Sequence, residues 1–424
     1  LAAVKAWLAA VTSDSTTLTN ATSTTALNTI TTTVLNNVAT TGTTYALTTA
    51  ADVISGTAGS DLINGYVKDG ATTGDTFTSS DNIDGGQGVD TLKLTVAGDA
   101  SAVVPVIKNI EILEARSVIA GAKVDASASS LTKLVADGST GTLEFKNIGK
   151  VTDLSIANTT SAHTFTYTAG ALGSTTAALN LALNAVGSSS VTPTVTIDAT
   201  TDVVTSLNIA ASGANFITTD NTASKPWATV KTLTVTGNGS LTLTGSANGL
   251  GAVTKVDASG NVGGVSVDLA SSSNAGNVTV TGGTGNDVVK FAAAQFTSLD
   301  SIDLGAGTAD KLVLADTSIS TNLKAAVNAV KGVEILGFSG AGITADVSGF
   351  TGTGTAGITS FSVETAGAVA FTGSTGSTTY SVAKSVDNNA STFAIANSVG
   401  ETATTLTLNG GVKTGTTTFT GIST

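Results

Sequence analysis

Aspartates set in glycine-rich turns are the residues of this chain best suited to chemistry. Residues 85–92 and 282–289 each fit the pattern G-G-x-G-x-D-x-U, in which U is a large aliphatic residue. Glycine permits backbone conformations that bring peptide carbonyls into a common cavity, and aspartate adds a charged oxygen. Several carbonyls with one or two carboxylates match the oxygen-rich shell that Ca²⁺ prefers. The turns therefore predict calcium binding.

The turns belong to a duplicated module that covers about residues 53–115 and 280–338. Each copy starts with a Gly-rich turn ending in Asp and leads through an Asp-x-Ile-Asp phrase into a second such turn. A strand follows, and the copy closes on a matching phrase that contains Glu-Ile-Leu. Two copies imply two equivalent sites. The candidate calcium ligands are Gly56, Gly59, Asp61, Asp81, Asp84, Gly86, Gly88 and Asp90 in the first copy and Gly283, Gly285, Asp287, Asp300, Asp303, Gly305, Gly307 and Asp310 in the second.

Simple turn chemistry is the alternative explanation, because Gly and Asp are common in β-turns of all proteins. Two full matches and two near matches, each pair joined by Asp-x-Ile-Asp, favour calcium. The turn-ending aspartates are nevertheless distant in sequence, so each site must recruit ligands through the intervening segment. The turn at residues 305–310 also carries one extra residue before its aspartate, which changes its geometry. The expected additional donors are Asp81, Asp84, Asp300 and Asp303.

Residue content disfavours a catalytic site. Cysteine is absent, which removes thiolate metal sites and cysteine nucleophiles. His163 is the only histidine and shares a predicted strand face with Phe165 and Tyr167. We expect it to be a core residue with satisfied hydrogen bonds rather than a general base. No G-x-S-x-G elbow surrounds a serine. Paired carboxylates for glycoside hydrolysis stay open as an alternative, but we expect no enzymatic activity.

Charge and composition argue against two further classes. The 424-residue chain has 18 Lys and Arg against 30 Asp and Glu, a formal net charge of −12, and Arg116 is its only arginine. Nucleic-acid binding needs clustered cations, so it is not expected. No run of about 18 apolar residues occurs, so no transmembrane segment is predicted. The hydrophobic content of 41% still allows a large core.

The elements around the turns must position them. Apolar residues at helical spacing predict two short N-terminal helices, at residues 1–12 and 23–39. From about residue 45, alternation with period two predicts strands, with centres near 154, 165, 180, 196 and 208 and near 234, 242, 254, 267 and 279. This spacing allows a sandwich or a solenoid. Short turns and only three prolines favour a mainly β, calcium-stabilised β-solenoid.

The same pattern divides the chain into five parts. Residues 1–44 are the helical tail of an N-terminal anchoring domain, and residues 45–122 are the first calcium module. Residues 123–279 are β-strand repeats, residues 280–340 the second calcium module, and residues 341–424 the C-terminal β-strand repeats.

The order of Gly-rich Asp turn, linker, Asp-x-Ile-Asp-Gly-Gly-x-Gly-x-Asp-x-Leu, strand and Ile-Glu-x-Leu resembles the RTX-type S-layer proteins of Gram-negative bacteria. The motif resemblance covers about residues 53–115 and 280–338, and the Thr- and Ala-rich composition resembles them over residues 45–424. Tandem arrays in that family place their turns about nine residues apart, a spacing that this chain does not have.

The resemblance implies a protein secreted by a type I system that folds on meeting external calcium and assembles with itself into a layer on the cell surface. It also implies attachment to outer-membrane lipopolysaccharide, through an anchoring region outside this chain. Two alternatives stay open. One is a calcium-stiffened RTX adhesin segment, and the other is the repeat part of an exported hydrolase, which would need a catalytic domain elsewhere.

Overall fold

The structure is a computed structural model, and most of the chain between residues 41 and 350 is described. The described residues are 41–70, 73–173, 177–199, 202–220, 226–245, 249–270, 277–350, 357–358, 360–364, 369–374, 378–382, 392–397, 404–408 and 418–420, with single residues 9, 19 and 23. Apart from residues 9 and 23, the two predicted N-terminal helices lie outside them.

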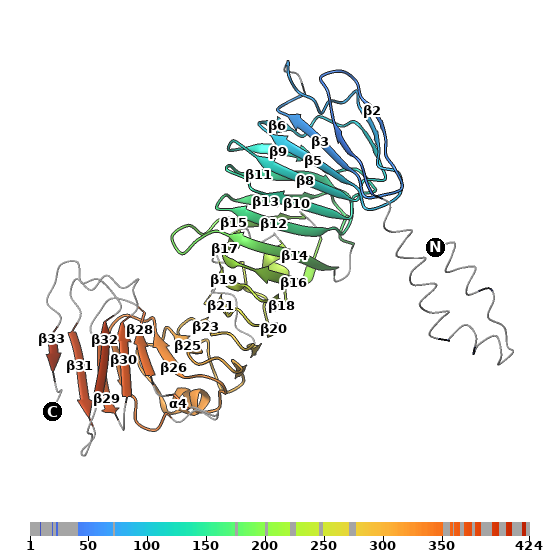
Figure 1. Cartoon of the computed structure of the whole chain (residues 1–424). Helices are drawn as coiled ribbons and strands as arrows, with labels where there is room; N and C mark the ends of the chain where they lie inside the picture. The colour runs from blue at the N-terminus through green and yellow to red at the C-terminus, as the bar shows by residue number, and fades with distance from the viewer. Residues whose placement is uncertain are drawn as a thin grey trace.

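The described residues form a parallel β-solenoid of about 11 coils, which confirms the predicted solenoid. Two long sheets of 12 and 14 strands follow its length, and successive strands of the chain alternate between them. A three-stranded sheet is added at the N-terminal end, and a four-stranded sheet alternates with the 14-stranded one near the C-terminal end. Figure 1 shows the strands as successive rungs, with β2 near one end and β33 at the other.

The 12-stranded sheet contains, in spatial order, β1 (Thr44–Ala46), β3 (Leu62–Val67), β5 (Thr91–Val96), β8 (Ile112–Ser117), β10 (Lys133–Asp137), β12 (Asp153–Thr159), β14 (Ala177–Val186), β16 (Val204–Ser212), β18 (Thr232–Gly237), β20 (Lys255–Asn261), β22 (Thr279–Thr281) and β24 (Ser301–Asp303). The three-stranded sheet contains β2 (Val53–Ser55), β4 (Asn82–Asp84) and β7 (Val106–Lys108).

The 14-stranded sheet contains β6 (Asp99–Ala100), β9 (Ala122–Asp125), β11 (Leu143–Ile148), β13 (His163–Tyr167), β15 (Thr194–Asp198), β17 (Ala214–Thr219), β19 (Ser240–Thr244), β21 (Val265–Asp268), β23 (Val288–Phe291), β25 (Lys311–Leu314), β26 (Ile335–Phe338), β28 (Ser360–Val363), β30 (Thr378–Val382) and β32 (Thr404–Leu408). The four-stranded sheet contains β27 (Ile343–Asp346), β29 (Val369–Ser374), β31 (Thr392–Asn397) and β33 (Thr418–Thr420).

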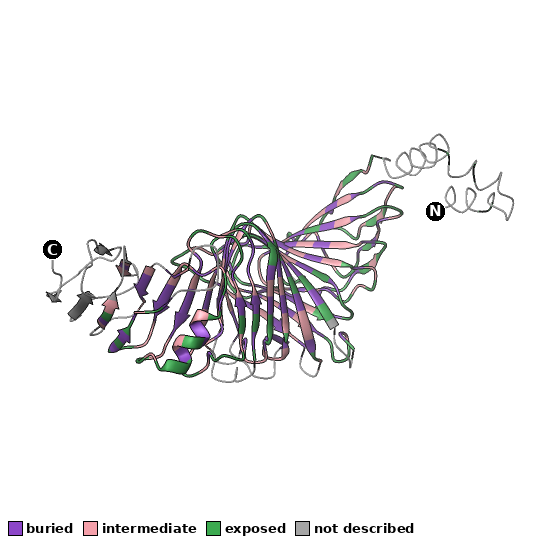
Figure 2. Ribbon diagram, turned by 90° about the horizontal axis from the view of Figure 1, so that it is seen from below, coloured by how far each residue is buried: buried purple, intermediate pink, exposed green. Residues whose placement is uncertain are grey.

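Alternating side chains explain why these segments form strands with one buried face. Buried and more exposed residues alternate along the rungs in Figure 2. The inward leucines of successive coils stand in register and are buried, and burial of each contributes about 1.5–3 kcal/mol. One such ladder consists of Leu92, Leu113, Leu134, Leu154 and Leu181. The apolar ladders form one continuous core inside the solenoid.

Two short helical segments interrupt the rungs, and the sequence did not predict them. The 3₁₀ segment η1 (Pro226–Thr229) buries Trp227, whose Nε1 donates to the carbonyl of Val195 at 2.8 Å. Helix α4 (Thr321–Asn328) is capped by Ser320, whose side chain accepts from the N–H of Leu323. In the part of the chain that the structure describes, no helix has the length and apolarity needed to cross a membrane.

The two modules occupy different corners of the solenoid. In the first, the Gly-rich turns lead from the three-stranded sheet to the 12-stranded sheet, between β2 and β3 and between β4 and β5. In the second, they lead from the 12-stranded sheet to the 14-stranded sheet, between β22 and β23 and between β24 and β25. The duplicated sequence therefore builds the same corner in two settings.

Candidate metal centre

Three acidic side chains form a column at the corner of the first module. Asp61, Asp90 and Glu111 directly precede or adjoin β3, β5 and β8, which are neighbours in register. The backbone N–H of Asp61 donates to Oδ1 of Asp90 at 2.7 Å, and the N–H of Asp90 donates to Oε2 of Glu111 at 2.8 Å. Each carboxylate thus accepts a hydrogen bond from the preceding coil, and the column fastens successive coils together.

The second module repeats this column with the same contacts. The N–H of Val265 donates to Oδ1 of Asp287 at 2.6 Å, and the N–H of Asp287 donates to Oδ1 of Asp310 at 2.6 Å. The N–H of Asp310 then donates to Oε2 of Glu334 at 2.9 Å. We call the first turn of each module the upper turn (residues 56–61 and 282–287) and the second the lower turn (residues 85–90 and 304–310).

In the upper turns, the second carboxylate oxygen is held by the turn itself. The N–H of Thr57 donates to Oδ2 of Asp61 at 2.6 Å, and the N–H of Gly283 donates to Oδ2 of Asp287 at 2.8 Å. Burial tends to raise the pKa of Asp61, but hydrogen bonds from Thr43 and Thr57 outweigh it and the pKa is lowered. The upper carboxylates are thus fully engaged by the protein.

The lower turn of the first module has a different hydrogen-bond pattern. The N–H of Gly86, which is equivalent to that of Thr57, donates to Oδ1 of Asp84 at 3.0 Å instead of to the turn-ending aspartate. Oδ2 of Asp90 consequently has no hydrogen-bond partner, although Asp90 is 0% exposed. Leaving a buried carboxylate oxygen unpaired is costly, so this atom marks a place for a ligand.

The lower turn of the second module has a similar hydrogen-bond pattern, with the backbone of Gly307 as an additional partner of Asp310. The N–H of Gly305 donates to Oδ1 of Asp303 at 3.2 Å, and Oδ2 of the fully buried Asp310 has no partner. Leu304 takes the position that Gly85 has in the first module, because the N–H of each donates to the carbonyl of the lysine that begins the closing phrase of its module, Lys331 or Lys108. The extra residue found in the sequence is thus accommodated without breaking the column.

The electrostatics of the columns favour a positive partner. Burial, together with the negative charge of Glu111, raises the pKa of Asp90. Burial and the charge of Glu334 raise the pKa of Asp310 to about 6, and burial raises the pKa of Asp287. The ion pairs among the described residues involve other carboxylates. A buried acid without a cationic partner either keeps a proton or binds a cation.

Glycines leave room for oxygens to converge on these carboxylates. A Cβ on Gly85 would lie 2.6 Å from Oδ2 of Asp90 and 2.1 Å from the carbonyl oxygen of Asn109. A Cβ on Gly56 would lie 2.7 Å from Oδ2 of Asp61 and 2.0 Å from the carbonyl oxygen of Gly85. A carboxylate and a peptide carbonyl therefore meet across each glycine, which is the donor set of Ca²⁺.

The remaining predicted glycines serve turn geometry and close packing of coils. Gly86, Gly88 and Gly305 have φ values of +88°, +132° and +89°, which L side chains rarely adopt. A Cβ on Gly88 would lie 2.6 Å from the carbonyl oxygen of Gly59 in the coil before it. The other predicted glycines lie in the same turns and are Gly283, Gly285 and Gly307.

The structure separates Asp81 and Asp300 from the columns. They precede β4 and β24, whereas the lower turns follow those strands, so each lies roughly 10 Å along the strand from its turn. Asp81 accepts hydrogen bonds from the N–H groups of Asp52 (3.0 Å) and Thr78 (2.7 Å). Asp300 likewise accepts from backbone N–H groups at 2.7 Å. These two aspartates close a second corner of the solenoid.

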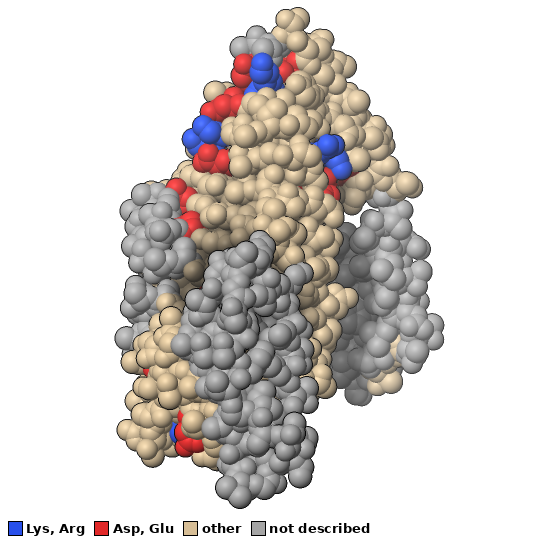
Figure 3. Space-filling model, turned by 90° about the vertical axis from the view of Figure 1, so that its left-hand side faces the viewer, with Lys and Arg blue, Asp and Glu red and all other residues tan. Residues whose placement is uncertain are grey.

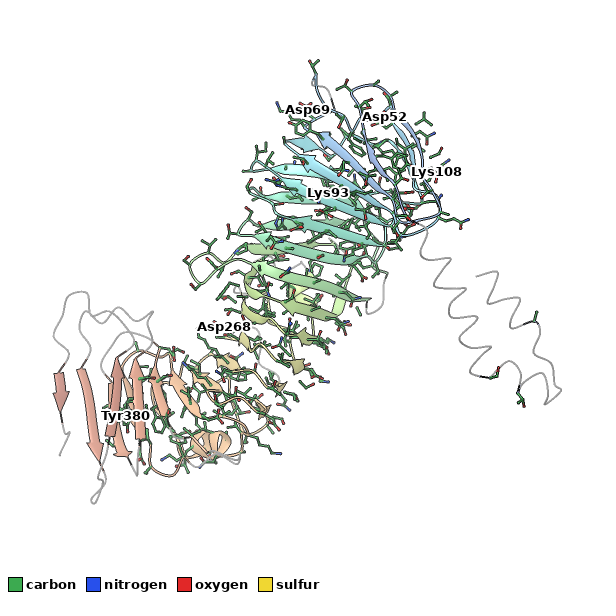
Figure 4. The ribbon with its side chains drawn as sticks, in the orientation of Figure 1. Asp52, Asp69, Lys93, Lys108, Asp268 and Tyr380 are labelled. Carbon is green, nitrogen blue, oxygen red and sulfur yellow. The ribbon has the colours of Figure 1, made fainter. Side chains whose placement is uncertain are left out.

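Asp84 and Asp303 do lie beside the columns. Oδ1 of Asp84 accepts from Nδ2 of Asn109 at 2.8 Å, and this bond is the main reason why the pKa of Asp84 is lowered. Lys108, which pairs with Asp84 in register across β4 and β7, lies at the N-terminal end of the solenoid in Figure 4. Asp84 therefore stays charged next to the lower turn.

Sequence reasoning missed Glu111 and Glu334, the third members of the columns. Their signal was present, because both stand in the matching phrases that close the two modules. Among the described residues, no three His, Cys, Asp or Glu side chains group closely enough to hold a metal by themselves. An ion at a column would therefore need peptide carbonyls as well.

His163 does not form part of a site. It points into the core with Phe165 and Tyr167, as predicted. Burial lowers the pKa of His163 to about 4, against the opposing effect of a hydrogen bond with the backbone of Leu143. A neutral histidine enclosed by apolar side chains is inaccessible to a substrate.

Comparison with known proteins adds no relative. The chain matches no protein family, no curated protein and no solved structure.

Proposed function

We propose that this chain is a calcium-stabilised, non-catalytic structural subunit of a self-assembling cell-surface layer. The observation that carries the proposal is the buried acidic column, built twice with the same hydrogen bonds at two corners of one solenoid. Asp90 and Asp310 each present a buried, unpartnered carboxylate oxygen. Calcium would supply the missing positive charge, with Asp90, Asp310 and nearby carbonyl oxygens as its holders.

Calcium would couple folding to location. A chain that is exported at low calcium keeps its columns repulsive, and the higher calcium concentration outside adds its binding energy to folding. At a hundredfold excess over Kd, each site contributes about 2.7 kcal/mol. This reasoning supports type I secretion and a cell-surface location, both implied by the resemblance to RTX-type S-layer proteins.

The surface suits lateral assembly. On the face shown in Figure 3, charged side chains gather near one end, and most of the remaining described surface is uncharged. Long parallel sheets with small polar side chains offer repeated flat contacts to other copies of the chain. A net charge of −12 would otherwise repel neighbours, so divalent cations between copies would favour a lattice. Lipopolysaccharide would be held by an anchoring region outside this chain.

Thermal unfolding with and without calcium tests the cation part. We expect the midpoint to fall when a chelator is added, and Asp90→Ala or Asp287→Ala to lower the midpoint in calcium. Equal midpoints of the unmodified protein in calcium and in chelator would contradict the proposal. Negative-stain images test the assembly part. Calcium-dependent sheets or tubes support a surface layer, whereas isolated rods in calcium would favour a stiffened adhesin segment.

A further inference from the structure

The two turns of each module differ as cation sites. In the upper turns, both carboxylate oxygens accept backbone hydrogen bonds, as Asp287 does from Val265 and Gly283. In the lower turns, Oδ2 of Asp90 and of Asp310 accepts none, although both residues are 0% exposed. The same difference appears in both modules. It is therefore a property of the repeated sequence and not of one local arrangement.

We propose that each module holds one cation, at its lower turn, and that the closing glutamate is a ligand. In the first module the side-chain ligands are Asp90 and Glu111, and in the second they are Asp310 and Glu334. This inference rests on the proposed calcium binding and fixes its stoichiometry and its ligands. The upper aspartates, Asp61 and Asp287, fasten coils together and do not hold an ion.

Glu111 and Glu334 each use one carboxylate oxygen to accept a hydrogen bond from the lower turn and have a second oxygen available for a cation. Oε2 of Glu111 accepts from the N–H of Asp90 at 2.8 Å, and Oε1 accepts no hydrogen bond from the described residues. Glu334 has the same arrangement below Asp310. The carbonyl oxygen of Asn109 approaches Oδ2 of Asp90 across Gly85. Oδ2 of Asp90 and the carbonyl of Asn109 thus lie on either side of Gly85, and Glu111 is joined to Asp90 through its other oxygen. Carboxylates and carbonyls of this kind are the donors that calcium prefers.

The aspartates that precede the lower turns keep this place open. Asp84 takes the N–H of Gly86, and Asp303 takes the N–H of Gly305. In the upper turns a neutral residue, Ser55, stands at the position of Asp84, and the equivalent N–H there goes to the turn-ending aspartate. Asp84 and Asp303 are therefore positioning residues. By accepting these N–H groups they leave Oδ2 of Asp90 and of Asp310 free to bind the cation.

Calorimetric titration of the full chain with calcium chloride tests the inference. We expect two ions for the unmodified protein, one for Glu111→Gln or Glu334→Gln, and none for the double variant. Glutamine keeps an acceptor for the N–H of Asp90 or Asp310, so folding is preserved and circular dichroism checks it. Asp61→Asn should still bind two ions. Glu114→Gln, at a half-buried position of β8 that pairs with Lys93, is the matched control and should also bind two.

A second variant probes the positioning role. Asp84→Ser copies the upper turn and should weaken calcium at the first module at least tenfold, with the second module unchanged. Four ions in the unmodified protein, or loss of an ion in Asp61→Asn with two retained in Glu111→Gln, would overturn the inference while leaving calcium binding intact. Absence of both binding heat and a calcium-dependent midpoint in the unmodified protein would instead overturn the proposed function.

Discussion

Coils of the same solenoid close the same corner in two different ways. Between the 12- and 14-stranded sheets, Asn215 and Asn261 close the corner in the coils before the second module, and Asp287 and Asp310 close it within the module. All four side chains are buried, with 3% exposure or less. The corner is thus built with an amide in one stretch and with a carboxylate in the next.

The asparagine side chains satisfy the backbone hydrogen-bonding groups of the corner without any charge. Oδ1 of Asn215 accepts from the N–H of Val186 at 3.2 Å, and its Nδ2 donates to the carbonyl of Ser240 at 3.1 Å, so it joins the preceding and following coils. A carboxylate can only accept. The fold therefore does not need a negative charge at this corner, and stacked carboxylates indicate a second requirement, which we assign to a cation.

Moving a charge into the amide corner should have the largest effect. Asn215→Asp loses the donation to Ser240 and buries a carboxylate without a cationic partner, which costs about 3–5 kcal/mol. Urea unfolding in calcium and in chelator should show the same loss. Asn184→Asp, at an exposed position of β14, is the control and should stay within about 0.5 kcal/mol. If calcium restored the stability of Asn215→Asp, any buried aspartate at this corner would create a calcium site. The amide and carboxylate corners would then not differ in the way that we propose.

Neutralising Asp310 separates its two roles, which are accepting the hydrogen bond from Asp287 and binding the cation. Asp310→Ala leaves the buried N–H of Asp287 without an acceptor, which costs about 1–3 kcal/mol in calcium and in chelator alike. Asp310→Asn retains an acceptor oxygen for that N–H, so this variant should be less stable than the unmodified protein in calcium but not in chelator. Differential scanning calorimetry of both variants in both conditions measures the difference. If the two variants lost equal stability in chelator, the hydrogen bond to Asp287 would have no part in closing the corner.

The solenoid and the places of its Gly-rich turns could be predicted from sequence, because both are local properties. Alternating residues specify strands, and glycine with aspartate specifies a turn. The stacking order of side chains was not predictable in the same way. Asp61 and Asp90 meet because the length of one coil places β3 beside β5 in register, and no local sequence pattern specifies the length of a coil.

The same reason explains the residues that were misjudged. Asp81 stands next to the lower turn in sequence, but β4 is extended and carries the two apart. Glu111 is distant from Asp90 in sequence, yet one coil brings it directly beneath. Comparison of the two copies contained the missing information, because Glu111 and Glu334 occupy equivalent phrases. A repeated acid deserves the same weight as a repeated glycine when a duplicated module is interpreted.

The pH dependence of the calcium-free protein sharpens the comparison further. Burial raises the pKa of Asp310 to about 6, well above the ordinary value of an aspartate. Since the folded state then binds the proton more tightly than the unfolded state, stability falls as pH rises from about 4 to 6. In Asp310→Asn, the decrease in the free energy of unfolding between about pH 4 and 6 should be smaller by about 1–2 kcal/mol.

Asp61→Asn is the matched variant for that measurement. The pKa of Asp61 is lowered, so Asp61 contributes stability above its unfolded pKa, and this is lost as pH falls. The two variants should therefore change the slope of thermal midpoint against pH in opposite directions in chelator. Slopes that change in the same direction would mean that the carboxylates of Asp61 and Asp310 are not held differently.

Charges on the outer faces should matter least. Glu114 pairs with Lys93 at 2.6 Å across neighbouring strands, and the side chain of Lys93 is 50% exposed. Such a pair contributes only about 0.2–1 kcal/mol, because water and salt screen it. Glu114→Gln should therefore lower stability by no more than this amount, equally in calcium and in chelator, and less at high salt. A calcium-dependent loss in Glu114→Gln would show that the cation acts through the general negative charge of the solenoid, and the buried columns would then lose their special status.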